Sequence, residues 1–169
     1  PKPDPRSTVK PGGIKASLPE VPQNARELYQ KALDLIKTGD SHGAIENLEN
    51  AISLYPKFPL ALNELGVQYL KLGEANKAIE PLRTASKLSP DAFSPHLNLG
   101  IALLEVRQLL EAEPELREAL KISSAPTAHM YLGLTLARMK NSAEAEKELK
   151  LAIELGGDQL PIAHYYLGG

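Results

Sequence analysis

A two-residue signature recurs along this chain at a nearly constant interval, and this periodicity limits the possible folds more than any other feature. Leu65-Gly66 returns as Leu99-Gly100, Leu132-Gly133 and Leu167-Gly168, at intervals of 34, 33 and 35 residues. Other residues keep the same register: a first alanine set (Ala44, Ala78, Ala112, Ala145), a second alanine set (Ala51, Ala85, Ala119, Ala152) and a leucine set (Leu48, Leu82, Leu116, Leu149). Such a period is typical of repeat architectures, in which each unit packs only against its neighbours.

The pattern within each unit is helical. From Asn24 onward apolar residues recur at i, i+3, i+4 and i+7, and no run alternates apolar with polar residues. Pro56 and Pro90 stand just past a helical run, where a proline ends a helix. Each unit therefore predicts a pair of short helices that must bury their apolar sides against the next pair.

The turns inside the units carry their own signals. Gly39 and Gly73 fall where a helix must reverse, which suits a residue in the left-handed conformation. In the fourth unit Asn141 is predicted to take that role, with Glu144 as its capping partner. The third unit offers only Val106-Arg107-Gln108.

These residues resemble the tetratricopeptide repeat, whose pattern is Leu-Gly, an aromatic residue, Ala, a large apolar residue, Ala and Pro. The resemblance covers residues 25–169 as units 25–58, 59–92, 93–125 and 126–160 and a truncated fifth, 161–169. The chain resembles bacterial members of the family, and the resemblance implies an all-α fold, a right-handed α-solenoid (superhelix) of antiparallel helix hairpins. The departures are Ala32 for the first glycine, the aromatic residue kept only at Tyr69, and Ser124 and Gly157 in place of the closing proline.

Packing within a hairpin can also be predicted. Gly66, Gly100 and Gly133 fall on the first helix of a pair and are expected opposite the alanines of the second, so that the two axes approach closely. Pro81 and Pro114 fall inside second helices, where a local bend is expected.

The N-terminal residues differ from this body. Six of the 14 prolines and Gly12-Gly13 lie in the first 22 residues, so residues 1–24 are predicted to be a Pro-rich linker. Its end contains Ile14, Leu18 and Val21, which we expect to dock in extended form on a neighbouring surface. The chain starts at Pro1 without an initiator methionine, which predicts a piece of a longer protein.

Composition excludes several kinds of function. With 19 Lys+Arg against 21 Asp+Glu and a net charge of -2, the 169-residue chain has no basic field for a nucleic acid. It contains no cysteine, and no apolar run is long enough to span a membrane. A cytoplasmic and an exported location therefore both remain open.

No catalytic or metal-binding motif occurs, so the sequence predicts neither an enzyme nor a bound cofactor or metal. His96, His129 and His164 occupy the same position of successive units, too far apart to share a metal, and are expected to pack between helices. His42 is expected to be solvated. The acidic cluster of Glu111, Glu113, Glu115 and Glu118 near Arg117 and Lys121 is expected to form an ordinary solvated face.

The resemblance implies a protein-interaction scaffold, because first helices in this family line a concave groove that receives peptides. The positions carried over are Tyr29, Leu33, Asn63, Val67, Leu97, Ile101, Met130, Leu134 and Tyr165. Position nine of the units is apolar throughout (Leu33, Val67, Ile101, Leu134), which favours an apolar ligand. The alternative is that this stripe fills contacts between helices.

The family's two-carboxylate clamp for acidic chaperone tails needs cations that this chain does not place in register. Its positions hold Tyr29, Leu33, Glu64, Ser94 and Asn98 in one frame. Clamp-type binding is therefore not expected. Two other functions stay open: self-assembly with a second copy through the C-terminal end, and a docking array for an enzyme whose catalytic part lies outside these residues.

Overall fold

The computed structural model describes residues 20–156, which form eight α-helices and no strand. The helices are α1 (Gln23–Thr38), α2 (Ser41–Leu54), α3 (Pro59–Lys71), α4 (Ala75–Leu88), α5 (Phe93–Glu105), α6 (Leu109–Ile122), α7 (Pro126–Arg138) and α8 (Ser142–Gly156). The predicted eight helices in four hairpins are confirmed.

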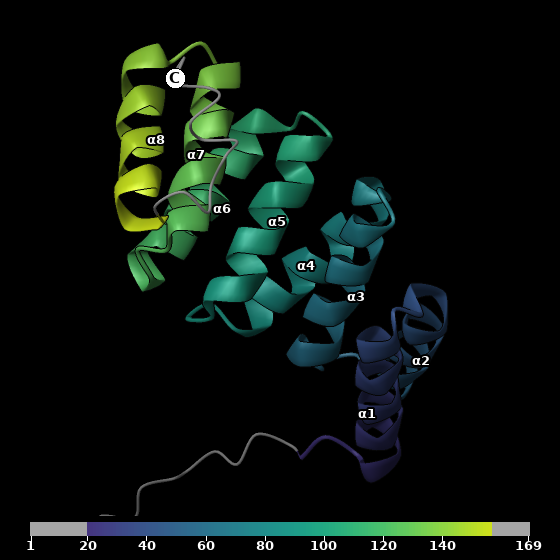
Figure 1. Ribbon diagram of the computed structural model, residues 1–169. Helices are drawn as coiled ribbons and strands as arrows, with labels where there is room; N and C mark the ends of the chain where they lie inside the picture. The colour runs from purple at the N-terminus through teal and green to yellow at the C-terminus, as the bar shows by residue number, and fades with distance from the viewer. Residues whose placement is uncertain (1–19, 157–169) are drawn as a thin grey trace, which may run out of the picture.

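The hairpins stack side by side into a curved row, from α1 and α2 at one end to α7 and α8 at the other (Figure 1). Each odd-numbered helix packs against its own even-numbered partner, and each even-numbered helix also packs against the next odd-numbered one. All extensive contacts are between neighbouring units, as the periodicity requires.

The three recurring residue sets form the core between the helices. Leu48, Leu82 and Leu116 are completely buried, and Leu149 is 2% exposed. Every member of the two alanine sets is at most 3% exposed. The signature leucines Leu65, Leu99 and Leu132 are buried as well. Their predicted burial is confirmed.

The signature glycines make the predicted close helix contacts, and their nearest neighbours are leucines that the prediction did not name. A Cβ on Gly100 would lie 2.5 Å from Cγ of Leu116, and a Cβ on Gly133 would lie 2.7 Å from Cγ of Leu149. A Cβ on Gly66 would clash with Leu82 in the same way. The predicted alanine neighbours are present for two glycines, since the same Cβ atoms would lie 3.5 Å from the Ala112 carbonyl oxygen at Gly100 and 3.2 Å from the Ala145 carbonyl oxygen at Gly133. The nearest atoms, however, belong to the leucine set, one turn further along the second helix.

The four turns inside the hairpins have one geometry. Each places a residue at positive φ: Gly39 at 84°, Gly73 at 73°, Arg107 at 63° and Lys140 at 64°. In each turn the amide of that residue and the next amide donate to carbonyls of the preceding helix, as Asn141 does to Leu136 at 2.9 Å.

The turn prediction is thus confirmed for Gly39 and Gly73 and wrong for Asn141. Lys140 takes the left-handed conformation in the fourth unit because it occupies the register of the two glycines, and α7 ends two residues before it, at Arg138. Asn141 does contact its predicted partner, since its Nδ2 donates to Glu144 Oε2 at 2.9 Å.

Both interior prolines are accommodated, and α4 and α6 run through Pro81 and Pro114 without interruption. At the N-terminal end α1 begins at Gln23, inside the predicted linker. Val21 is half-buried against the first hairpin, whereas the predicted docking residues Ile14 and Leu18 lie outside the described residues. The residues predicted to form a truncated fifth unit, with Leu167-Gly168 and Tyr165, also lie outside them.

Candidate peptide-binding face

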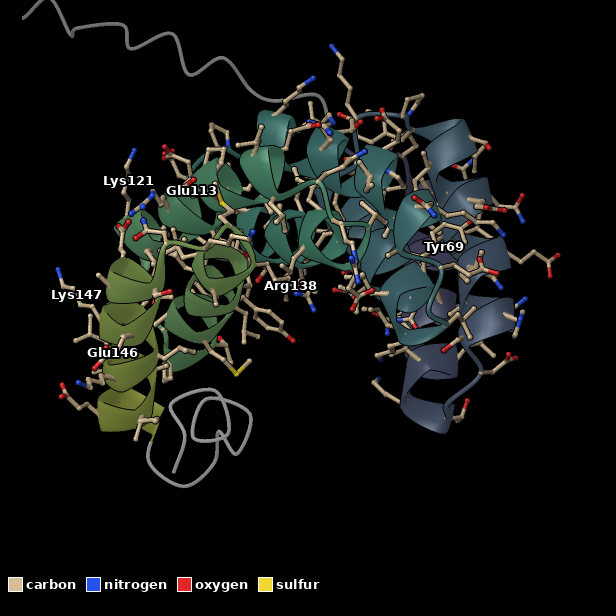
Figure 2. All side chains as sticks on the ribbon, turned by 90° about the horizontal axis from the view of Figure 1, so that it is seen from above. Tyr69, Glu113, Lys121, Arg138, Glu146 and Lys147 are labelled. Carbon is tan, nitrogen blue, oxygen red and sulfur yellow. The ribbon has the colours of Figure 1, made fainter. Side chains whose placement is uncertain are left out.

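The curvature of the row gives the protein an inner and an outer side. Figure 2 looks down on the edge formed by the four hairpin turns, with Arg138 of α7 on the inner side of the arc and Lys121 of α6 and Lys147 of α8 on the outer side. We call the inner surface of α1, α3, α5 and α7 the concave face.

The structure places eight of the nine predicted groove residues, and Tyr165 lies outside the described residues. Six are half-buried and so expose part of their side chains: Tyr29, Leu33, Asn63, Val67, Leu97 and Ile101. Met130 and Leu134 are only 5% and 9% exposed, and they join the core cluster that contains Leu99 and Leu103. The partly exposed predicted residues therefore belong to α1, α3 and α5.

An amide pair connects two of these helices. Asn98 of α5 donates from Nδ2 to Oδ1 of Asn63 on α3 at 3.0 Å. Both side chains are half-buried, and each asparagine has more donors and acceptors than this one bond uses. Asn98 was not among the predicted groove residues, although its place next to Leu97 in the repeat was a usable signal.

Two tyrosines of first helices, Tyr29 of α1 and Tyr131 of α7, have raised pKa values. Burial raises the pKa of Tyr29, and the nearby Glu64 carboxylate raises it further. The Tyr29 ring also packs at 5.1 Å, centroid to centroid, on the buried Phe58. On α7, burial and then Glu105 raise the pKa of Tyr131. Both phenols keep their protons in the neutral range.

At the end of the concave face nearest the hairpin turns, a hydrogen bond links the third and fourth units. Arg138 NH1 of α7 donates at 3.0 Å to the carbonyl of Leu104 in α5, which also accepts a bond from the Arg107 amide in the turn. Glu64 of α3, Glu105 of α5 and Arg138 of α7 all belong to first helices, so these helices carry charges of both signs.

His96 and His129 pack between helices, as predicted, whereas His164 lies outside the described residues. His96 and His129 are each 9% exposed, and the Nδ1 of each lies 2.7 Å from a carboxylate oxygen of the second helix, Glu115 or Glu148. The other ring nitrogen contacts the loop before the helix, at the Pro90 carbonyl or Ser124 Oγ. These bonds fasten each hairpin to its entry loop. His42 is exposed.

The predicted solvated acidic face needs one correction. Glu113 and Glu118 do pair with Arg117 and Lys121, at 2.9 and 2.5 Å. Glu115 instead turns inward to His96. These two residues are 19 positions apart, as are His129 and Glu148, which make the equivalent contact in the next unit. That equal spacing was the sequence signal for the two pairs.

On the outer side, ion pairs link successive second helices. Arg83 of α4 pairs with Glu111 of α6 at 2.9 Å, and Arg117 of α6 pairs with Glu144 of α8 at 2.7 Å. One unit earlier the bond is of another kind: Tyr69 of α3 donates to Glu49 of α2 at 2.7 Å. Burial and this bond raise the pKa of Tyr69 to about 12.

We expect the Arg117–Glu144 pair to add pH-dependent stability. The bond from Arg117 lowers the pKa of Glu144, so its contribution is complete at neutral pH and disappears as the pH falls below about 4 and through the lowered pKa. Arg117→Met should therefore lower the melting temperature slightly at neutral pH and not in acid. Lys87→Met, at an exposed lysine, is the control, and a deficit that persists in acid would contradict this role.

No helix among residues 20–156 is long and apolar enough to cross a membrane. The same residues contain no group of three or more side chains suited to hold a metal ion.

Comparisons with known proteins agree with the repeat architecture. Three family models match, one described as TPR repeat over residues 68–106 and two as tetratricopeptide repeat over residues 47–80 and 97–159. Together they extend over residues 47–159. No curated protein matches the sequence. The chain belongs to the tetratricopeptide repeat family.

Solved structures share the fold at low sequence identity. MamA from Desulfovibrio magneticus is 20% identical with a TM-score of 0.80, over 88% of this chain and 84% of that one. TTC0263, a TPR protein of Thermus thermophilus, is 23% identical with a TM-score of 0.68, over 87% and 81%. YrrB, described as a TPR protein with an unusual peptide-binding site, is 20% identical with a TM-score of 0.77, over 84% and 74%. The predicted all-α, right-handed solenoid is confirmed.

Proposed function

We propose that the protein is a binding scaffold without catalytic activity, and that its concave face receives a peptide segment of a partner protein. The observation that carries this proposal is the arrangement on α1, α3 and α5. There the half-buried Leu33, Val67 and Ile101 occupy one position of successive units, and the Asn63–Asn98 amide pair lies on two of the same helices.

This combination suits an extended peptide with apolar side chains. Burial of about 300 Å² of apolar surface contributes about 7 kcal/mol at roughly 25 cal/mol per Å². Ordering of the peptide offsets much of that, which leaves weak to moderate affinity. The unused donors and acceptors of the amide pair can bond to a peptide main chain. The peptide-binding site named in the description of YrrB supports the same kind of ligand.

Self-association through the C-terminal end, predicted as an alternative, would involve residues 157–169, which lie outside the described range. A docking role beside a catalytic domain also stays a prediction. Both are compatible with a peptide on the concave face, so the test below addresses that face directly.

The combined substitution Val67→Asp with Ile101→Asp should abolish binding of peptides selected from a random displayed library against the wild-type protein. Two carboxylates would face the apolar side chains of the ligand, while the half-buried positions let the charges reach water and the fold persist. Isothermal titration measures the affinity, and circular dichroism the helix content and melting temperature.

The matched control is Leu54→Asp with Leu155→Asp, which places the same charges at positions that are 47% and 52% exposed on the second helices α2 and α8. This control should bind as the wild type does. If the concave-face variant retained both its melting temperature and its affinity, the ligand would bind elsewhere.

A further inference from the structure

The edge formed by the hairpin turns has an unusual corner between the third and fourth units. All four turns lie along this edge, at the upper side of the row in Figure 1. The first two use Gly39 and Gly73 at positive φ, a conformation that glycine adopts without steric cost. The other two place Arg107 and Lys140 there, although a side chain crowds the backbone in that conformation.

The corner also has an open hollow of about 530 Å³. It is lined by Arg107, Gln108, Leu109, Leu110, Glu111 and Met139. Leu110 is 81% exposed, more than any other large apolar side chain among the described residues. Met139, from the neighbouring turn, is half-buried and directly precedes Lys140. The hollow therefore combines the apolar side chains of Leu110 and Met139 with the cationic Arg107, and Lys140 follows Met139 in the chain.

The charge of this corner is not balanced locally. Among the described residues neither Arg107 nor Lys140 has an ion pair or a side-chain hydrogen bond. The one carboxylate in the lining, Glu111, is engaged by Arg83 at 2.9 Å. The nearby Arg138 guanidinium donates to the Leu104 carbonyl rather than to an acid. Two cations are thus free to meet a ligand.

We propose that this corner is a second binding surface, separate from the concave face, for an acidic peptide segment with an apolar side chain. The apolar side chain contacts Leu110 and Met139, and flanking carboxylates pair with Arg107 and Lys140. Charge complementarity selects this ligand. It also excludes the N-terminal residues 1–19 of the chain itself, which carry four cations (Lys2, Arg6, Lys10, Lys15) against Asp4.

A double substitution at the two turn residues can reduce peptide binding without lowering the stability of the fold. Arg107→Gly with Lys140→Gly removes both charges and relieves both left-handed residues, so the melting temperature should stay equal or rise. The probe is a short fluorescein-labelled peptide of alternating glutamate and leucine, followed by fluorescence anisotropy. Its affinity should fall by about tenfold or more, the loss expected for two charge-assisted contacts.

Three further measurements make the test specific. Lys87→Ala with Lys121→Ala removes the same net charge from exposed helix positions and should leave the affinity unchanged. Leu110→Ser should weaken binding without unfolding, since that side chain is already in water. A peptide of alternating lysine and leucine should not bind.

Four outcomes would overturn the proposal. The glutamate–leucine peptide fails to bind the wild type, or the Lys87/Lys121 control loses as much affinity as the glycine variant. Alternatively, Val67→Asp with Ile101→Asp abolishes binding of this peptide, which would assign it to the concave face. Finally, vesicles containing phosphatidylserine bind in an Arg107- and Lys140-dependent manner while the peptide does not, which would make the corner a membrane contact.

Discussion

Replacing Gly100 with valine will lower the free energy of unfolding by roughly 1–3 kcal/mol, the usual cost of overpacking a closely packed contact. The added Cβ alone would lie 2.5 Å from Cγ and 2.6 Å from Cδ2 of Leu116. Leu116 is completely buried and cannot move into solvent, so α5 and α6 must separate. In a domain of this size each kcal/mol corresponds to a decrease of about 2–4 °C in melting temperature, which calorimetry measures.

The control is Thr127→Val, a nearly isosteric change at an exposed position near the start of α7. It introduces the same β-branched side chain into a first helix without a new contact, so its melting temperature should stay close to that of the wild type. An equally stable Gly100→Val protein would show that the hairpin does not need this close approach.

Leu116→Ala will have a still larger effect, about 2–5 kcal/mol, because it removes a fully buried side chain and leaves a cavity between α5, α6 and α7. The same substitution creates the space that a Cβ on residue 100 needs. The next neighbour of that Cβ on the facing helix, the Ala112 carbonyl oxygen, lies at an ordinary contact distance of 3.5 Å.

A double-mutant cycle therefore follows. Gly100→Ala should be destabilising in the wild-type background and neutral or stabilising with Leu116→Ala, where alanine also contributes its higher helix propensity, about 1 kcal/mol. The coupling should be about 0.5–3 kcal/mol, the range found for residues in direct contact. Denaturant titrations of the four proteins measure it, and strictly additive free energies would contradict the contact.

Much of the fold can be predicted from the sequence because the core repeats. Ala44, Leu48 and Ala51 recur in every unit, and a position that is apolar or small four times in register has to be buried each time. The leucine that lies nearest each glycine was missed for a geometric reason. Periodicity shows which residues share a face, whereas the turn of the facing helix that meets Gly100 depends on how the two helices are offset along their axes.

The turn prediction for the fourth unit was wrong because it relied on the conformational preferences of single residues. Asparagine tolerates positive φ better than lysine does, so Asn141 was preferred. The repeat register outweighs that preference, because the carbonyls of Leu136 and Ala137 fix which residue must reverse the chain. Successive intervals of 34, 34 and 33 residues lead from Gly39 to Gly73, Arg107 and Lys140. The repeat period alone would therefore have predicted that Lys140 takes the left-handed conformation.

The candidate site was less predictable than the fold. Of the residues predicted at position nine, Val67 and Ile101 are half-buried, yet Leu134 at the same position is buried. How much of a side chain remains exposed depends on the packing around each hairpin, and Leu134 lies in the same core cluster as Ile79, Leu103 and Leu104. No pattern within a single unit encodes those long-range contacts.

The most direct test of the peptide-binding concave face is an NMR titration of the protein, with labelled Ile, Leu and Val methyl groups, against a library-selected peptide. Methyl signals of Leu33, Val67 and Ile101 should shift together and saturate with one affinity, while those of Leu54 and Leu155 on the second helices stay in place. Shifts confined to methyl groups of the second helices, with Val67 and Ile101 unchanged at saturation, would contradict peptide binding on the concave face.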